Sequence, residues 1–430
     1  MLNLSNKFQE QTLKWQNPLN FAKKISDNYG DESWIFLYSA LSEKVDNSFS
    51  YIALFPKEEI ISENFSEIAA VTKDHKIWFG YLSYELGQQF EDLPKTQKSY
   101  INLPKIWLIN FSVILQFDHK KKKLMAFFDD QENLEKALKY RLKKKIQKEI
   151  KSREFQSNFS DETYLEEISD IKKMISEGNF YQTNLTRKFF GKLNIDKKSS
   201  SYFSLFSRLC KISPANYAAF LSLKKNYIIS ASPELFLTIN NKGIVKSRPI
   251  KGTMPRSDDE KQDQKNKLEL KNSTKERAEN LMIVDLVRND LSRVCEAGTV
   301  EVKKLFDVTS YKTVHHMSSE VSGKVEDNFA MTDVIKACFP AGSMTGAPKI
   351  KAMEVVARKE GLNRGVYSGA IGFIGNDLVN LSVVIRTLIC RDDDFEFQVG
   401  GAITFDSDEK KELEEIFNKA RGIMKLLDVF

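Results

Sequence analysis

Strand-like and helical runs follow one another in this chain without a regular alternation of strand and helix. Runs rich in aromatic and branched residues lie at 34–38, 50–54, 77–81 and 106–116, and the first long helical pattern comes only at 161–177. A doubly wound parallel sheet needs a helical crossover after almost every strand. The pattern therefore predicts an α+β fold, in which packed β-layers are covered by helices.

The rest of the chain continues this mixture. Further strands are expected at 124–128, 217–221, 227–230, 235–239, 370–374, 378–389 and 396–399, and helices at about 260–291, 331–338, 348–360 and 408–427. A highly charged, helix-compatible run covers residues 132–156 and separates the two halves of the pattern. We therefore expect two domains, an N-terminal region over residues 1–155 and a second domain over residues 156–430.

Charge and hydrophobicity exclude some classes of protein. The 65 basic and 59 acidic residues leave a net charge of +6, and the lysines gather at 120–123 and 136–151. Such runs can bind nucleic acid, but only Tyr140 interrupts the second one with an aromatic ring, so we favour a solvated helix face. No stretch approaches the roughly 18 apolar residues of a membrane helix, and the N-terminus lacks a signal-peptide pattern. We expect a cytoplasmic protein that binds neither nucleic acid nor membrane.

Cysteines and histidines give weak signals. The four cysteines lie far apart, without C-x-x-C or zinc spacing, and are expected to be small buried hydrophobic residues. His315 and His316 are adjacent, so on a strand their side chains face opposite sides and at most one points into a given site. For such a pair, structural packing is favoured over a functional role.

Two helical stretches each carry a pair of carboxylates three residues apart. These are Glu276 and Glu279 in the first, and Glu412 and Glu415 in the second. Spacing of i, i+3 places both side chains of a pair on one helix face. Two such faces brought together would form an oxygen-rich site suited to Mg²⁺. Exposed glutamates at this spacing are also common on ordinary helices, so the spacing alone leaves both interpretations open.

Other polar features stand near prolines and glycines. Lys251, in SRPIKGTMPR, is expected in a tight loop, and as a neutral amine it could act as a nucleophile, although among 65 basic residues the residues alone favour a solvated surface lysine. Glycine-rich turns are expected at 340–349 and 399–405, and neither is a P-loop. Together with Lys349 and Arg386 they could bind a dianionic small molecule, or they could be plain turns.

From about residue 160 onward, the chain resembles a known family along its whole length. The segments that carry the resemblance are, in order, EGNFYQTNLTRKF, SPELF, RPIKGT, KERAENLMIVDLVRNDL, HHMSSEVSG, PAGSMTGAPKIKAME, YSGAIGFI and GGAITFDSD with ELEEIFNKA. They resemble the chorismate-utilising enzymes, which include anthranilate, aminodeoxychorismate, isochorismate and salicylate synthases. The resemblance implies the fold of anthranilate synthase component I, with two β-sheets face to face and helices outside, and a chorismate-binding catalytic domain at 156–430.

One residue separates the branches of this family. Lys251 in PIKGT is similar to aminodeoxychorismate synthases, whereas anthranilate synthases typically carry alanine there. The resemblance thus implies an amino-group transferase, of the transaminase class, that makes 4-amino-4-deoxychorismate from chorismate and ammonia for 4-aminobenzoate and folate biosynthesis. Because the synthase part accounts for the 430 residues, the ammonia is expected from a separate glutamine amidotransferase subunit.

The resemblance also assigns roles residue by residue. It implies Lys251 as the nucleophile, Glu234 as a general acid with a raised pKa, and His316 beside the reacting ring. It implies Mg²⁺ binding by Glu279 and Glu415, with Glu276 and Glu412 in support. It implies substrate binding by a further set: Gly252, Thr253, Ser343, Tyr367, Arg386, Gly400, Gly401 and Ala402.

Three alternatives remain at this point. An anthranilate synthase would add ammonia at C2 and eliminate pyruvate, but it leaves Lys251 unexplained. A basic nucleic-acid-binding protein would explain the lysine run and predict salt-sensitive affinity, but leaves the family segments unexplained. A catalytically inactive regulatory subunit is disfavoured because Lys251 and all four metal-site glutamates are present.

Overall fold

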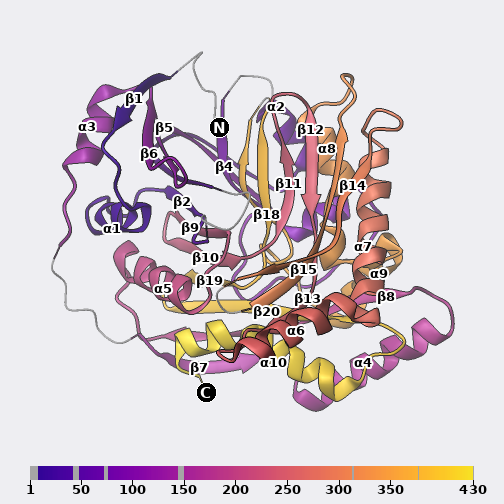
Figure 1. Cartoon of the computed structure of the whole chain (residues 1–430). Helices are drawn as coiled ribbons and strands as arrows, with labels where there is room; N and C mark the ends of the chain where they lie inside the picture. The colour runs from indigo at the N-terminus through magenta and orange to yellow at the C-terminus, as the bar shows by residue number, and fades with distance from the viewer. Residues whose placement is uncertain are drawn as a thin grey trace.

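The strand β5 (Ile106–Asp118) joins two layers of antiparallel strands in the computed structural model (Figure 1). β3 (Phe49–Ser62) pairs along the length of β5, while β4 (Trp78–Leu82) and then β6 (Lys123–Phe128) pair with successive halves of it. The structure describes residues 8–41, 48–71, 76–143, 150–311, 314–375 and 377–429. All the strands in these ranges are connected through hydrogen-bonded neighbours.

Both layers begin at β5, one through its pairing with β3 and the other through its pairing with β4. The first layer runs through β3, β2 (Trp34–Tyr38), β9 (Tyr217–Leu223), β10 (Asn226–Ser232), β19 (Thr387–Arg391), β20 (Asp394–Ile403) and β8 (Gln182–Leu193), which carries β7 (Ser152–Ser157) and β16 (Gly346–Ala347). β1 (Gln9–Leu13) pairs with β6. The second layer runs through β4, β17 (Ala370–Ile374), β18 (Val379–Val383), β11 (Leu235–Ile239), β12 (Ile244–Arg248) and β15 (Val314–Lys324), which carries β13 (Ile250–Pro255) and β14 (Glu301–Ser310).

The two layers face each other across a shared hydrophobic core. Ile35 and Ile228 of the first layer belong to the same buried cluster as Phe79 and Phe373 of the second. Separate clusters lie beneath the helices on the outer faces. Alternating strand residues therefore point inward between the layers or outward under helices. The predicted α+β fold with two facing β-layers and outer helices is confirmed.

Helices cover both outer faces. They are α1 (Pro18–Asn28), α2 (Ile68–Val71), α3 (Gln131–Lys139), α4 (Asp161–Ser176), α5 (Ser199–Ile212), α6 (Glu260–Asn272), α7 (Thr274–Ser292), α8 (Met331–Cys338), α9 (Lys349–Glu360) and α10 (Glu409–Leu427), with 3₁₀ turns η1 (Phe65–Glu67), η2 (Tyr84–Gln89) and η3 (Gly342–Met344). Side-chain caps fix several starts: Asp408 accepts a hydrogen bond from the backbone of α10, and Ser160 from that of α4. Gly361, at φ 67°, ends α9 in the left-handed conformation.

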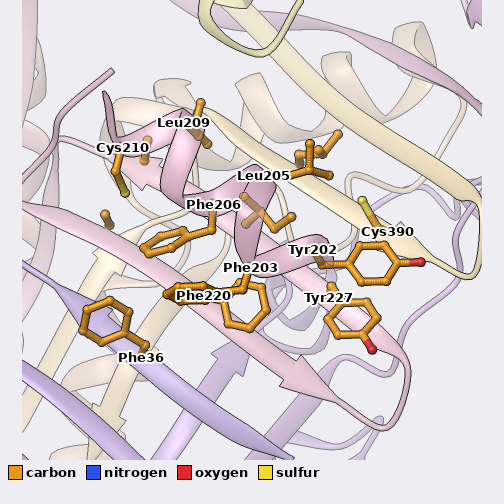
Figure 2. Close-up of a cluster of buried hydrophobic side chains, with 14 of the residues drawn as sticks. Phe36, Tyr202, Phe203, Leu205, Phe206, Leu209, Cys210, Phe220, Tyr227 and Cys390 are labelled. Atoms are coloured by element: carbon orange, nitrogen blue, oxygen red, sulfur yellow. The ribbon is translucent and has the colours of Figure 1, made fainter. Parts of the chain in front are cut away.

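Helix α5, which the sequence reasoning missed, packs on the first layer through an aromatic face (Figure 2). Tyr202 stacks on Tyr227 of β10 with ring centroids 3.8 Å apart, and Phe203 meets Phe220 of β9 edge-on. The apolar residues of α5 recur at 202, 203, 206, 209 and 210, a helical spacing that was visible in the sequence. The serines between them make the run look like a loop, because serine favours turns over helix interiors.

Three predicted elements are broken or shortened in the structure. The expected helix at 260–291 is two helices, because Ser273 ends α6 and its side chain caps α7 by accepting from Glu276 N. The expected strand at 378–389 is interrupted at Arg386, whose φ of 52° breaks the extended backbone between β18 and β19. The charged run at 132–156 is helical only in α3, and its residues 144–149 lie outside the described part of the chain.

Strands from both sides of residue 155 pair directly. β2 pairs with β9, and β4 pairs with β17. The division at residue 155 stays a prediction, while the layers themselves are built from both parts of the sequence. All four cysteines are free and buried, as expected. Among the described residues, no helix combines the length and the apolar character needed to cross a membrane.

Candidate functional site

Lys251 lies on a distorted strand and not in the tight loop that its neighbours in the sequence predicted. Its strand β13 shifts register against β15 at this point, and Gly252 takes a φ of 87°. A Cβ on Gly252 would lie 2.8 Å from Glu276 Oε2, so this glycine also allows the strand to approach α7 closely. Bulges re-aim side chains. Here Lys251 Nζ lies 3.8 Å from Glu279 Oε2, and the lysine side chain is only 11% exposed.

The structure brings the two predicted carboxylate pairs together. Glu276 and Glu279 lie in the first turns of α7, and Glu412 and Glu415 in the first turns of α10. Lys275 joins the two helices, because its Nζ lies 3.5 Å from Glu412 Oε1 and 4.0 Å from Glu279 Oε1. Burial and the neighbouring carboxylates raise the pKa of Glu276 and of Glu412. Such mutual repulsion is what a bound cation would relieve.

The chemistry of this cluster fits a divalent cation. Glu412 is buried, and its Oε2 is without a hydrogen-bond partner in the structure. Carboxylate oxygens are the ligands that Mg²⁺ prefers, and Mg²⁺ is bound through few of them. Within the described residues, no three acidic, histidine or cysteine side chains already stand in a metal-coordinating arrangement. The ammonium group of Lys275 lies between the carboxylates instead.

Glu234 is enclosed at the start of β11 and is poised to hold a proton near neutral pH. Its side chain hydrogen-bonds Ser343 and the backbone of Ile250, and the residue is only 4% exposed. Burial raises the pKa of Glu234 to about 7, although Lys251 and Lys419 act in the opposite sense. A carboxyl group with this pKa can donate a proton to a leaving hydroxyl and recover it later. The predicted rise in its pKa is therefore present.

The adjacent histidines face opposite sides of β15, as the sequence predicted. His316 Nδ1 lies 2.8 Å from Thr253 Oγ1, beside Gly252 and Lys251 on β13. Its pKa is lowered to about 3, first by burial and then by the charge of Arg386, so its imidazole is neutral at physiological pH. His315 points away and bonds with Asp263, with 3.0 Å between Nε2 and Oδ1. Only His316 faces the site.

Arg386 is the cation best placed to bind an anionic substrate. Its charge lowers the pKa of His316, and the carboxylate of Glu234 acts to raise the pKa of Arg386, so the three side chains interact electrostatically. Burial lowers the pKa of its guanidinium. Within the described part of the chain, no hydrogen bond or ion pair occupies that guanidinium. A half-buried arginine of this kind favours a carboxylate, which it can bind through two parallel hydrogen bonds.

Further predicted substrate residues surround the same space. Ser343 lies on η3 beside Glu234, and Tyr367 is buried with a pKa raised by burial. The glycines at 400 and 401 lie within β20, so the predicted turn at 399–405 is wrong for residues 399–403. They keep the strand close to its neighbours: a Cβ on Gly400 would lie 2.6 Å from Thr186, and one on Gly401 3.3 Å from Glu412 Oε2. Ala402 follows them on the same strand.

Two lysines of the site were missed by the sequence reasoning. Lys419 Nζ lies 2.6 Å from Glu415 Oε1 and donates to the carbonyl oxygen of Gly400 at 3.0 Å. Burial tends to raise the pKa of Glu415, but Lys419, with Lys251 and Lys275, lowers it below its usual value. The i, i+4 spacing of Glu415 and Lys419 was a usable signal. No local sequence pattern indicated the contact of Lys275 on α7 with Glu412 on α10.

A buried network of charged side chains, formed by Arg364, Glu360 and Glu85, lies next to the site. Arg364 is almost fully buried and pairs with Glu360, with 2.7 Å between Nη2 and Oε1. Its guanidinium also donates to the carbonyl oxygen of Met344 at 2.8 Å, next to Ser343. Glu85 accepts from the backbone of Arg364 at 2.6 Å. This network fixes the segment that carries Ser343, because charge-assisted bonds in a buried setting hold their geometry firmly.

Lys349, which the sequence suggested could help to bind an anion, is engaged in an ion pair. Its Nζ lies 2.6 Å from Asp290 Oδ2 and donates to the carbonyl oxygen of Cys338 at 3.2 Å. The side chains of Lys349 and Asp290 are 13% and 6% exposed. This lysine is therefore engaged in a nearly buried ion pair, and Arg386 remains as the anion-binding candidate of the two.

Comparison with known proteins agrees with this geometry. The profile of the chorismate binding enzyme family matches residues 20–425. Aminodeoxychorismate synthase component 1 of Escherichia coli (strain K12) is 35% identical over 353 residues, which cover 81% of this chain and 76% of that protein. Anthranilate synthase component 1 of Aquifex aeolicus (strain VF5) is 30% identical over 372 residues, covering 81% and 74%.

A solved structure shows the same architecture. Anthranilate synthase component I from Streptococcus pneumoniae TIGR4 superposes with a TM-score of 0.77 at 27% sequence identity, over 88% of this chain and 92% of that one. The match extends over both β-layers and not over the site alone. Because the family profile covers nearly all of the sequence and a relative is 35% identical over most of both chains, this chain belongs to the chorismate binding enzymes.

Proposed function

We propose that this chain is the synthase component of an aminodeoxychorismate synthase. It converts chorismate and ammonia into 4-amino-4-deoxychorismate, the precursor of 4-aminobenzoate and folate. The relatives named aminodeoxychorismate synthase component 1, at 35% identity in Escherichia coli and Salmonella typhimurium, support this reaction. The observation that carries it is the enclosed Lys251, which faces Glu279 and lies close enough to Glu234 to influence its pKa.

Substrate binding follows from the charges of the site. Chorismate carries two carboxylates, and Arg386 offers one of them a guanidinium without another partner among the described residues. Ser343, Tyr367 and the backbone of Gly400, Gly401 and Ala402 would complete the pocket, as would Gly252 and Thr253. Glu276, Glu279, Glu412 and Glu415 would hold Mg²⁺. When bound, this ion would supply positive charge to the ring carboxylate.

The reaction proceeds in two displacements. Nζ of Lys251, as the free amine that a nucleophile requires, forms a bond to C2 while the C4–O bond breaks, and Glu234 donates its proton so that water leaves. Ammonia then forms a bond to C4 while the C2–Nζ bond breaks, and Lys251 is restored. Glu234 needs its raised pKa for the first displacement, since an ordinary glutamate is ionised at neutral pH. His316, held neutral, packs beside the reacting ring.

The partner and the location belong to the same proposal. A separate glutamine amidotransferase subunit would supply the ammonia, in keeping with the name component 1 of the bacterial relatives. In this scheme nitrogen passes from glutamine to chorismate, which places the enzyme among the transaminases. A cytoplasmic location fits the four free, buried cysteines, because disulfides are rare in that compartment.

Anthranilate synthesis is the second candidate. It is favoured by the relative in Aquifex aeolicus, at 30% identity. In that reaction ammonia itself adds at C2, the carbon that Lys251 would occupy in our mechanism. A lysine enclosed at this position would compete with ammonia, so we place this function second.

One assay separates the two functions. The purified chain is incubated with chorismate, Mg²⁺ and a high ammonium concentration, with and without an excess of aminodeoxychorismate lyase, and the aminobenzoate isomer is identified by chromatography. We expect 4-aminobenzoate only when the lyase is present. Formation of 2-aminobenzoate without the lyase would instead show an anthranilate synthase. A Lys251→Ala variant of the same preparation serves as the matched control.

A further inference from the structure

One carboxylate outside the site joins three elements that border it. Asp263 lies on α6 and is only 7% exposed. Its two oxygens each accept a hydrogen bond of 2.8 Å from the guanidinium of Arg256, the residue that follows β13, and Oδ1 also accepts from the backbone of Ser257 at 3.0 Å. Nε2 of His315 on β15 lies 3.0 Å from the same Oδ1. The mechanism above gives Asp263 no role.

The contacts of Asp263 are charge-assisted. The hydrogen bonds from Arg256, followed by the bond from the backbone of Ser257, hold the pKa of Asp263 well below its usual range. A carboxylate can only accept hydrogen bonds, so Nε2 of His315 carries the proton that faces it. Nδ1 of the same ring lies 2.9 Å from Oγ of Ser310 on β14. Bonds to an ionised group in a nearly buried setting hold their geometry firmly.

The histidine pair connects this cluster to the site. Successive side chains of a strand point to opposite faces, so His315 faces Asp263 while His316 faces the site. His316 pairs directly with Thr253 across β15 and β13, and 2.8 Å separates Nδ1 from Oγ1. A rotation of β15 about its own axis would therefore disturb the contact of His315 with Asp263 and that of His316 with Thr253 together.

Arg256 reaches His316 by a second path. Its Nη1 donates to the carbonyl oxygen of Tyr311, which lies between β14 and β15. The ring of Tyr311 meets that of His316 edge-on, with centroids 5.5 Å apart, and the Tyr311 hydroxyl accepts from Asn216 at 3.4 Å. Because Asp263 holds Arg256, it also fixes this aromatic neighbour of His316.

Polar contacts do most of the work of holding α6 on these strands. The buried residues of α6 are Asp263, Asn266 and Leu270, of which only the leucine is apolar. Asn266 donates to the carbonyl oxygen of Pro255 at 3.0 Å. Leu270 lies against the strand at Gly252, where a Cβ would be 2.9 Å from its Cδ1. A polar substitution at Asp263 should therefore loosen the strands without opening a hydrophobic core.

We propose that Asp263 is a positioning residue, which holds β13 and β15 so that Thr253 and His316 keep their places beside the reacting ring. The inference rests on the proposed function. Asp263 acts through Arg256 and His315 and does not itself meet the substrate. Such support matters because a displacement of about 1 Å at a reacting centre can cost on the order of 10²-fold in rate.

Asp263→Asn tests the proposal at nearly constant size. The amide keeps one acceptor but places a donor against the guanidinium of Arg256, which can itself only donate. Asp259→Ala is the matched control, because Asp259 caps the same helix by accepting from Gln262 N at 2.7 Å. Its loss weakens α6 and leaves the contacts of Asp263 in place. Arg256→Lys, which keeps the charge and loses the paired bonds, takes the place of Asp263→Asn if that variant does not fold.

Two measurements are made on each purified variant, after thermal unfolding has shown that it is folded. In protein with ¹⁵N-labelled histidine, long-range ¹H–¹⁵N spectra report the imidazole nitrogens of the chain's four histidines. A His316→Gln variant identifies the signals of His316. Steady-state kcat and the KM for chorismate are measured with Mg²⁺, ammonium chloride as the nitrogen source and lyase in excess.

We expect Asp263→Asn and Arg256→Lys to shift the ring-nitrogen signals of His316 and to lower kcat by about 10- to 100-fold. The KM for chorismate should stay constant, because Arg386 lies between other strands, β18 and β19. Asp259→Ala should change neither the spectrum nor kcat. Unchanged His316 signals in the folded variants would overturn the proposal.

Equal changes in the control variant would overturn it as well, because they would make the role of Asp263 one of helix stability alone. If the wild-type chain forms no aminodeoxychorismate with ammonium, the proposed function fails. The spectrum of His316 then still decides whether Asp263 positions this ring, so the two failures are distinguishable.

Discussion

Glu234→Gln should abolish the proton donor while making the folded protein more stable at high pH. Burial raises the pKa of Glu234 from 4.5 to about 7, so the folded protein resists ionisation of this carboxyl group. Because the folded pKa lies above the unfolded one, the group contributes most to stability below pH 4.5. That contribution is lost as the pH rises through 7. Glutamine is an uncharged isostere and escapes the loss.

The magnitude follows from the size of the shift. A shift from 4.5 to about 7 corresponds to roughly 3 kcal/mol at pH 8, at about 1.4 kcal/mol for each pKa unit. Because Glu234 is buried, little of this is removed by solvent screening. We expect the free energy of unfolding of Glu234→Gln, relative to wild type, to rise by about 2 kcal/mol between pH 5 and pH 8.

Urea unfolding at pH 5 and pH 8 measures this difference for wild type and Glu234→Gln. The exposed Glu166→Gln variant on α4 controls for the general loss of one negative charge. The same preparations give the pH–rate profile: kcat/KM for chorismate should fall about tenfold per pH unit above pH 7, and by 10²–10⁴-fold in Glu234→Gln. A stability difference independent of pH would refute the reasoning, because it would mean that Glu234 ionises as an ordinary surface glutamate.

Four further outcomes are expected. Lys251→Ala should lower kcat by on the order of 10³-fold or more, since it removes the nucleophile, while chorismate still binds in a fluorescence titration. Glu415→Gln should weaken Mg²⁺ binding by at least about tenfold in calorimetry, because one oxygen ligand loses its charge. Lys275→Met should instead tighten Mg²⁺ binding, because its ammonium no longer competes for Glu279 and Glu412. Arg386→Lys should raise the KM for chorismate about tenfold through loss of the paired hydrogen bonds; an unchanged KM would exclude this residue from carboxylate binding.

Much of the fold could be predicted from local patterns. The strand at 34–38 and the helix at 331–338 have the bounds that the sequence predicted, because the first is an unbroken run of aromatic and branched residues and the second has apolar residues at helical spacing. The sequence patterns did not predict the single residues at which a helix or a strand is interrupted. Ser273 separates two helices while both sides keep a helical composition, and Arg386 interrupts a strand through a left-handed φ that arginine rarely adopts.

The site shows a similar division between local and distant information. Spacing placed Glu276 beside Glu279 and Glu412 beside Glu415, since each pair lies on one helix. Which helices meet is decided by packing on the β-layers, and no pattern in the sequence states it. The ion pair of Lys349 with Asp290 depends on packing in the same way, so the sequence alone did not predict it and left anion binding open for that lysine.

Several acidic side chains of the site are held where ionisation is unfavourable, so the structure around them must be stable enough to keep them in place. Glu234, Glu276 and Glu412 all have raised pKa values, so the fold carries acidic groups in places that disfavour their ionised forms. Such groups reduce stability, and proteins retain them where their chemistry is required. The compensation lies next to the site: Arg364 and Glu360 form a buried ion pair with several further hydrogen bonds. Because that pair anchors the segment carrying Ser343, the partner of Glu234, it stabilises the fold and also holds the proton donor where a substrate would meet it.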